Sequence, residues 1–367
     1  MKNNVKNIAV TVCFIMITCG FMLTNIIMQD AEFSYSERRR LAGNPPYSFE
    51  KLISGDLFEE YENYFLDQFV FRDSFRSLKA LTSRYLFKQK DNNGLYMVDE
   101  SIYKMEYPLN EKAIMNAAKK LNEVYSKYLT GKNVSYAIIP DKNYFTASQN
   151  GYLTMDYNRI LEIMNENVYN MNYIDLFSTM DIKDFYKTDI HWSQDKIIDI
   201  AHKILKEMGN DVLASDYQYE EKRLYPFYGS YYGQAALNLD PDTMVYLTNS
   251  IIENAVVSDP IHKEYSKVYM IDKFRDIDSY NLFLSGAKSV ISVTNPACDK
   301  DKELIIFRDS FGSSIAPLLI GEYSKTTLVD LRYIGTDILG DYVDFSEAQD
   351  ILFLYNTQIL NNSYMLK

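Results

Sequence analysis

The chain is poor in the residues that most often build metal sites and disulfide frameworks. Its 367 residues include only three histidines, three cysteines and one tryptophan. Two of the cysteines, Cys13 and Cys19, lie in one apolar N-terminal run, so no set of disulfides within a domain is available. Positive charge is also scarce: the net charge is −12 and the pI is near 4.9, which argues against nucleic acid as a partner. A hydrophobic content of 47% and an aromatic content of 14% exclude a mainly disordered chain.

The N-terminal run from Ile8 to Met28 carries no charged residue. A helix of about 20 apolar residues spans a bilayer, so residues 1–32 are predicted to form a transmembrane anchor. Lys2 and Lys6 favour a cytoplasmic N-terminus, although the three arginines of 38–40 weaken that preference. We expect a single-pass protein of the cell membrane with its main domain outside the cytoplasm. Cleavage as a signal peptide is the alternative, but residues 29–31 make a poor cleavage site.

Residues 33–108 are predicted to form a helical and hairpin region. Apolar residues recur at helical spacing in Arg72–Lys88, and a second helix is expected at Asp56–Asp67. Leu95–Val98 and the strand at Ile102-Tyr103 indicate a short hairpin.

Residues 109–367 alternate between strands and helices. The helices are expected at Ala113–Tyr128, capped by Asn110, at Tyr157–Asn165, capped by Asp156, at Gln194–Met208 and at Ser313–Tyr323. The strands are expected at Val134–Ile139, Asn172–Leu176, Leu304–Phe307, Thr327–Leu331 and Ile351–Tyr355. Five short apolar strands separated by helices predict an α/β fold with a parallel sheet covered by helices on both faces. Residues 215–295 break this rhythm and are interpreted as a β-rich insertion.

The turn after the strand Leu304–Phe307 holds a candidate nucleophile. Ser310 follows Arg308-Asp309 and precedes a helix, at the edge of the sheet where ligands bind in open α/β folds. Backbone N–H groups at the start of that helix can stabilise an oxyanion. The alternative is that Ser310 or Ser313 only caps the helix, as serines at such turns commonly do.

A second motif supplies the groups that a serine nucleophile needs. Asp189 and His191 stand two residues apart, at another strand-to-helix junction expected on the same sheet edge. A serine hydroxyl needs a neighbouring base held in place by a third group. The alternatives are a cap or salt bridge for Asp189 and a half-buried structural role for His191. A metal site is disfavoured because no second cluster of histidine or cysteine accompanies the pair.

The remaining histidines and aromatic residues have simpler interpretations. His202 lies inside a predicted helix and His262 in a polar turn, and neither has a nucleophile and an acid close in sequence. Trp192 and the tyrosines of 225–232 could stack on sugar rings, although core packing is the expected role of most of them.

Together these motifs resemble the DHHW-type proteins, relatives of the alginate O-acetylation proteins within the SGNH-hydrolase-like superfamily. The resemblance covers nearly the whole exported part of the chain. It rests on the order and spacing of Glu37–Leu41, Asp67–Asp73, Pro140–Lys142, Phe185–Trp192, Arg308–Gly312, Asp330–Tyr333 and Leu354–Asn356.

The resemblance implies a Ser-His-Asp site in which Asp189 orients, His191 is the general base and Ser310 is the nucleophile. Asn356 is the candidate for the oxyanion-hole asparagine, and Arg332 is a weaker candidate for binding anionic or acyl groups, with a structural salt bridge as its alternative. The sequence departs from the family pattern at Ile190, where the first histidine of the name-giving motif is expected. It departs again at Arg308, where many relatives have glycine.

These observations lead to three functional hypotheses. The first is an anchored, extracytoplasmic O-acetyltransferase that acts on a cell-surface or secreted polysaccharide through an acetyl-serine intermediate. The resemblance implies a membrane-embedded acyltransferase as its acetyl supplier, and no cofactor or metal is expected. The second is a carbohydrate acetylesterase with the same triad. The third is a non-catalytic polysaccharide-binding or scaffold protein on the same fold.

Overall fold

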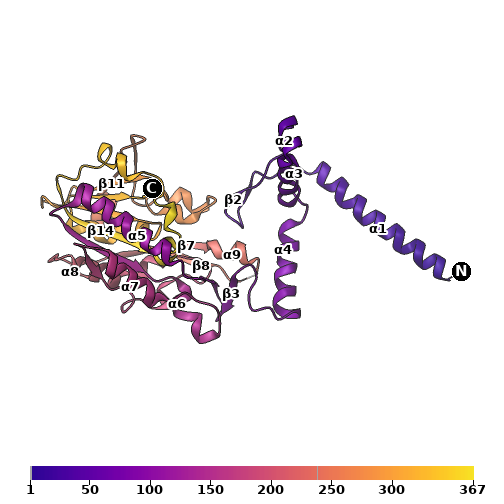
Figure 1. Cartoon of the computed structure of the whole chain (residues 1–367), viewed down its shortest axis with the longest axis horizontal. Coiled ribbons are helices and arrows are strands. Elements are labelled where there is room, and N and C mark those ends of the chain that lie inside the picture. Colours follow the sequence, from indigo (N-terminus) through magenta and orange to yellow (C-terminus); the bar gives the residue numbers. More distant parts are fainter. Residues whose placement is uncertain (1, 238) are drawn as a thin grey trace. The chain divides into compact units, whose positions relative to one another are not determined.

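The computed structural model describes residues 2–237 and 239–367, and it divides into two compact units. The first unit comprises the chain up to Asn92 together with a short segment that starts at Tyr232. The second unit comprises Asn93–Tyr231 and Leu239–Lys367. Figure 1 shows the elements of both units.

The first unit is mostly helical. It contains α1 (Lys2–Ile27), the two-residue strands β1 (Phe33–Ser34) and β2 (Arg39–Arg40), α2 (Phe49–Ser54), α3 (Asp56–Asp67) and α4 (Arg72–Leu81). A π-helical turn at Thr82–Leu86 continues α4. Within α1, Val5–Ile27 is long and apolar enough to cross a membrane.

Two segments of the first unit that the sequence analysis identified lie against each other. Arg39 of β2 donates to both carboxylate oxygens of Asp67, at 2.7 and 2.5 Å. Arg72 and Arg76 of α4 pair in turn with Glu37, at 2.5 and 3.1 Å. These ion pairs join the segment around β2 to α3 and α4.

The second unit is built on an eight-stranded sheet in the order β10-β9-β11-β13-β12-β14-β5-β6. Its strands are β5 (Asn133–Ile139), β6 (Asn172–Ile174), β9 (Val256–Asp259), β10 (Glu264–Ser266), β11 (Val290–Thr294), β12 (Glu303–Arg308), β13 (Lys325–Val329) and β14 (Ala348–Asn356). The five strands predicted from the sequence are β5, β6, β12, β13 and β14, and they run parallel to one another. The hairpin β3 (Leu95–Val98) and β4 (Ser101–Lys104) also belongs to this unit.

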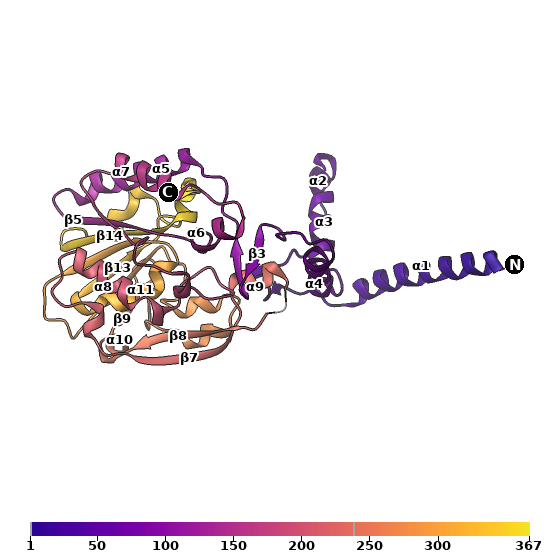
Figure 2. The ribbon, with the colours of Figure 1, turned by 90° about the horizontal axis from the view of Figure 1, so that it is seen from below.

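Helices cover both faces of the sheet, as Figure 2 shows. One face packs on α5 (Glu111–Val124) and α7 (Tyr157–Asn167), and the other on α8 (Ile198–Glu207) and α11 (Phe311–Leu319). The strands alternate between these layers: Ile305 and Phe307 of β12 lie in the first, whereas Leu304 and Ile306 lie in the second. This alternation explains why the central strands are almost entirely apolar.

The predicted insertion at 215–295 is only partly separate from this sheet. β7 (Glu220–Phe227) and β8 (Asp242–Thr248) form their own antiparallel pair. The strands that follow, β9, β10 and β11, instead extend the main sheet in antiparallel register beside β13. The sequence did not predict that these strands join the main sheet, because hydrophobic alternation identifies a strand but not the strand with which it pairs.

Two helix starts also differ from the prediction. α8 begins at Ile198, after a short 3-10 turn at Gln194–Lys196, because both ends of the Gln194 amide are used elsewhere. It donates to the carbonyl of Ser314 at 2.6 Å and accepts from the N–H of Leu247 at 2.7 Å. α11 begins at Phe311, directly after Ser310, and not at Ser313.

Candidate active site

The turn between β12 and α11 presents Ser310 at the carboxyl end of a central strand. Asp309, one residue earlier, accepts from the backbone N–H of Phe311 at 2.9 Å and from that of Asn356 at 2.7 Å. Asp309 therefore caps α11 and joins the ends of β12 and β14. The side chain of Ser310 makes no capping hydrogen bond, so the capping alternative does not describe this serine.

Close packing inside this turn requires a glycine at position 312. A Cβ added to Gly312 would lie 2.5 Å from Cβ of Arg308. The long side chain of Arg308 is fully buried, and its guanidinium donates to the carbonyl of Gly286 at 3.2 Å and lies 3.7 Å from Asp330. Arg308 therefore packs beneath the turn, and the first turn of α11 lies directly on it.

The structure brings the three residues of the predicted triad together. Nε2 of His191 lies 2.7 Å from Oγ of Ser310, and Nδ1 of His191 lies 2.6 Å from Oδ1 of Asp189. The backbone N–H of His191 donates to the same carboxylate oxygen at 2.9 Å. With Nδ1 donating to Asp189, Nε2 is the acceptor that faces the serine hydroxyl. This arrangement can remove a proton from Ser310 as its oxygen attacks a carbonyl carbon.

The second oxygen of Asp189 is held by the segment around Gly229. The backbone N–H of Ser230 donates to Oδ2 of Asp189 at 2.5 Å. Thr188 accepts from the N–H of Gly229 and donates to Asp242. A Cβ on Gly229 would lie 2.4 Å from the backbone N of Asp189, so only glycine permits this approach. The carboxylate thus accepts from three donors and is fully buried.

Lys142 holds the loop that carries Asp189 from the other side. Its buried ammonium lies within 2.7 to 3.2 Å of four backbone carbonyls, those of Ile102, Tyr186, Lys187 and Asp189. Burial lowers the pKa of Lys142 to about 7, while the charges of Asp242 and Asp189 act in the opposite direction. Because three of the four carbonyls belong to residues 186–189, Lys142 fixes the backbone next to the carboxylate.

The imidazole itself is packed between aromatic rings. Tyr280 lies parallel to His191, and Phe311 tilts against it with its centroid 4.9 Å away. The hydroxyl of Tyr280 and the indole N–H of Trp192 both donate to Oγ of Ser314, each at 2.7 Å. The hydroxyl of Ser314 in α11 therefore positions two residues around His191. These are Tyr280, whose ring packs against the imidazole, and Trp192, the next residue in the sequence.

Sequence reasoning assigned no role to three of these residues, Lys142, Tyr280 and Ser314. Tyr280 is one of 32 tyrosines, and its neighbours in sequence form no recognisable motif. Lys142 did offer a signal, because it belongs to Pro140–Lys142, one of the segments on which the resemblance rests. Trp192 packs in the core as expected and is fully buried.

The two secondary candidates are not hydrogen-bonded to Ser310 in the part of the chain that the structure describes. The side-chain amide of Asn356 donates to the carbonyl of Ile139 at 3.2 Å, and its oxygen accepts from the N–H of Gln358 at 2.9 Å. Asn356 thereby caps α12 (Thr357–Leu360). Arg332 forms a bidentate ion pair with Asp330: its Nε donates to Oδ1 at 2.8 Å and its Nη2 to Oδ2 at 2.6 Å.

The other histidines lie in separate local contacts. His202 is 2.5 Å from the hydroxyl of Ser215, and His262 is 2.8 Å from a carboxylate oxygen of Asp259. Each pair is local in sequence, and these contacts connect neither histidine to the triad.

Comparison with known proteins places this geometry in context. The sequence profile of the family described as DHHW protein matches residues 94–329. The structure is similar to that of a DHHW family protein from Eubacterium siraeum, with 17% identity, a TM-score of 0.60, and 75% of this chain and 94% of that chain covered. It is also similar to Bacillus cereus PatB1 carrying a sulfonyl adduct, with 15% identity, a TM-score of 0.58, and 72% and 95% of the two chains covered.

A more distant similarity is to the O-acetyltransferase domain of Pseudomonas putida AlgJ, with 11% identity, a TM-score of 0.45, and 73% and 92% of the chains covered. No curated protein matches the sequence. The α/β fold predicted from the sequence, with parallel central strands and helices on both faces of the sheet, is confirmed.

Proposed function

The chain belongs to the DHHW protein family, and from this starting point we propose that it is an O-acetyltransferase that uses Ser310, His191 and Asp189. Its acceptor is a cell-surface or secreted polysaccharide, and α1 anchors it in the cell membrane with the second unit outside the cytoplasm. The observation that carries the proposal is the hydrogen-bonded chain from Asp189 through His191 to Ser310.

The reaction has two acyl-transfer steps. In the first, Oγ of Ser310 attacks the carbonyl carbon of an acetyl donor while Nε2 of His191 takes the serine proton. The donor's leaving group departs with that proton, and an acetyl ester of Ser310 remains. In the second step a sugar hydroxyl attacks the ester, His191 takes the hydroxyl proton, and Ser310 recovers its proton as the acetylated sugar leaves. Asp189 stays ionised and holds the imidazole throughout.

Each step passes through a tetrahedral oxyanion. Ser310 stands at the N-terminus of α11, where the positive end of the helix dipole favours negative charge. The backbone N–H of Phe311 is already taken by the carboxylate of Asp309. Asn356 remains the side-chain candidate, but its amide must first leave the carbonyl of Ile139. For Arg332, the ion pair with Asp330 favours a structural role.

The acetyl donor must come from outside the chain. A membrane-embedded acyltransferase that delivers acetyl groups across the bilayer fits an anchored, outward-facing enzyme. The chain itself requires no cofactor for this chemistry, because serine ester exchange needs only the base, the oriented carboxylate and the oxyanion donors.

The test compares acetyl transfer with ester hydrolysis by the purified full-length protein. An activated acetyl ester is offered with and without an oligosaccharide acceptor, and acetylated sugar and free acetate are measured separately. We expect transfer to exceed hydrolysis when acceptor is present, and both to disappear in Ser310→Ala. Ser313→Ala is the matched control, because the hydroxyl of Ser313 is buried in the first turn of α11 and has no hydrogen-bond partner in the described structure.

Two other outcomes identify the rival functions. Hydrolysis that exceeds transfer at every acceptor concentration indicates an acetylesterase. If a sulfonyl fluoride leaves Ser310 unmodified and no acetate is released, the chain is a non-catalytic polysaccharide-binding or scaffold protein.

A further inference from the structure

The continuous helix formed by α4 and the turn at Thr82–Leu86 exposes a stripe of large apolar side chains. Their exposed fractions lie between 43% and 69%, and they are Phe71, Phe75, Leu78, Leu81 and Tyr85. Spacings of three and four residues place them on one face of the helix. An exposed apolar stripe of this length on a helix of a soluble protein marks an interaction surface.

The opposite face of the same helix is the one that packs inward, and its buried residues are small. Ala80 and Ser83 are buried, and Arg72 and Arg76 on the flank pair with Glu37. A surface helix of a globular protein normally buries its large apolar residues and exposes its small and polar ones. The helix of α4 does the reverse.

The stripe is continuous with the membrane-spanning candidate α1. The ring of Phe21 in α1 stacks on Phe69 with centroids 5.6 Å apart, and Phe75 of α4 lies 5.9 Å from Phe21. The side-chain oxygen of Asn25 accepts from the N–H of Val70 at 2.8 Å.

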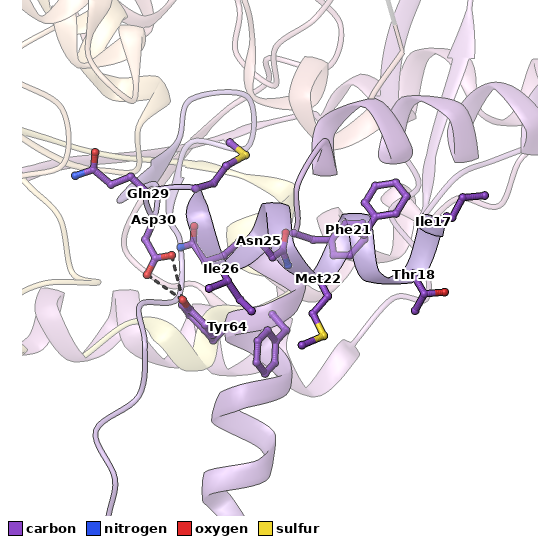
Figure 3. Close-up of a pocket in the computed structure, with 13 residues that line it drawn as sticks. Ile17, Thr18, Phe21, Met22, Asn25, Ile26, Gln29, Asp30 and Tyr64 are labelled. Carbon is purple, nitrogen blue, oxygen red and sulfur yellow. Dashed lines mark hydrogen bonds between the residues drawn. The ribbon is translucent and has the colours of Figure 1, made fainter. Parts of the chain in front are cut away.

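A groove lies where α1 meets α3. Its volume is about 1280 Å³, and its walls include Phe21, Met22, Asn25, Tyr64, Phe65 and Phe69. Figure 3 shows the side chains of α1 lining it, with the hydroxyl of Tyr64 hydrogen-bonded to Asp30 at its polar end. An apolar groove with a tyrosine and a carboxylate at one end matches the change from acyl chains to headgroups in a lipid layer.

Charge reverses locally around the stripe. The protein carries a net charge of −12, yet residues 72–90 contain one acidic residue, Asp73, and six basic ones: Arg72, Arg76, Lys79, Arg84, Lys88 and Lys90. Arg72 and Arg76 pair with Glu37, so the charge available to a surface comes from the later part of this segment. A basic amphipathic helix with an aromatic and leucine face is the composition of helices that lie in the surface of a bilayer containing anionic lipids.

We propose that the helix of α4 rests in the bilayer surface where α1 leaves it, with the apolar stripe among lipid acyl chains and Lys79, Arg84 and Lys88 at the headgroups. The inference rests on the part of the proposed function that has α1 spanning a membrane. We assign lipid, and not a second protein, as the partner of the stripe and the groove. Both are continuous with α1, and lipid surrounds α1 where it spans the membrane.

The experiment uses the full-length chain in nanodiscs of neutral and anionic phospholipid, with one fluorescent label at a time. Three single-cysteine proteins are compared: one that keeps only Cys19 of α1, one that carries Leu78→Cys in the stripe, and one that carries Asp73→Cys outside the stripe, where the side chain is 64% exposed. Quenching by nitroxides on the lipid acyl chains is measured against quenching by aqueous iodide.

We expect the label at position 78 to be quenched by lipid nitroxide at least about threefold more than the label at position 73, and to be protected from iodide. The label at Cys19 is the reference for the spanning helix. If position 78 is as open to iodide as position 73 while Cys19 is quenched by lipid, the surface contact is wrong and the anchor stands. Protection of position 78 from both quenchers also overturns the proposal, since protein then covers the stripe. If iodide quenches Cys19 as well, the anchor is wrong and this inference falls with it.

Discussion

Tyr280 lies flat against His191, with ring centroids 3.7 Å apart and ring planes within 8° of parallel. The phenol hydroxyl is directed away from the imidazole and donates to Ser314. A stack of this kind restricts rotation of the imidazole about the bond that joins it to the backbone, so Nε2 stays aimed at Ser310.

Replacing the stacked ring tests this role. Tyr280→Ala removes both the ring and the hydrogen bond, whereas Tyr280→Phe removes only the bond. We expect the rate of sulfonylation of Ser310 to fall about 10- to 100-fold in Tyr280→Ala and less than about fivefold in Tyr280→Phe. Intact-protein mass spectrometry follows the reaction. Equal losses in the two variants would show that the hydrogen bond to Ser314, and not the stack, matters.

Asp189→Asn tests whether the carboxylate orients the base. An amide cannot accept from Nδ1 of His191 while keeping its hydrogen bonds to the backbone, so the ring loses the tautomer that places an acceptor at Nε2. The expected loss is about 10³- to 10⁴-fold in the rate of acetyl release. Asp199→Asn, an exposed carboxylate in α8, is the control and should retain the full rate. A small loss in Asp189→Asn would contradict the triad.

Lys142→Met keeps the length of the side chain and removes its donors. Four carbonyls lose a partner, and the loop of residues 186–189 loosens next to Asp189. We expect kcat to fall about 10- to 100-fold with little change in KM, because the reacting groups move while the acceptor site is untouched. Partial recovery in Lys142→Arg would support a positioning role, and a rise in KM alone would argue against it.

Lys142 also links stability to pH. Its pKa is about 7 in the folded protein and about 10.4 in an unfolded chain, so between these values the unfolded chain binds more protons. The free energy of unfolding contributed by this group therefore rises with pH across that window. Urea unfolding at about pH 6.5 and about pH 9.5, followed by the fluorescence of Trp192, should show a gain in the natural protein that Lys142→Met lacks.

Gly312→Ala tests the packing beneath the nucleophile. The new methyl group meets the buried side chain of Arg308, which cannot withdraw without losing its contact with Asp330. We expect a loss of about 1 to 3 kcal/mol in the free energy of unfolding and slower sulfonylation of Ser310. Gly43→Ala is the control, because a Cβ there meets nothing within 4 Å. Unchanged stability in Gly312→Ala would mean that the turn can shift.

The parallel sheet and the three residues of the triad could be predicted from the sequence because each is encoded locally. Strands such as β12 and β14 are short apolar runs, and Asp189 and His191 are two residues apart. Residues that depend on pairing across long separations could not be predicted. Tyr280 lies in a 3-10 turn between β10 and β11, far from His191 in sequence, and their contact depends on packing that no short pattern records. The capping role of Asn356 was also not predicted. Asn356 is both the last residue of β14 and the N-cap of α12, and the apolar pattern before it indicates only the strand.

The position of β14 has a consequence for how the sheet assembles. β14 is the last strand in the sequence, yet it pairs with β12 on one side and β5 on the other. Before residues 348–356 are synthesised and added to the sheet as β14, no strand joins β12, which leads to Ser310, to β5, which leads to Lys142. A growing chain therefore carries the reactive serine before the sheet that organises its surroundings is complete.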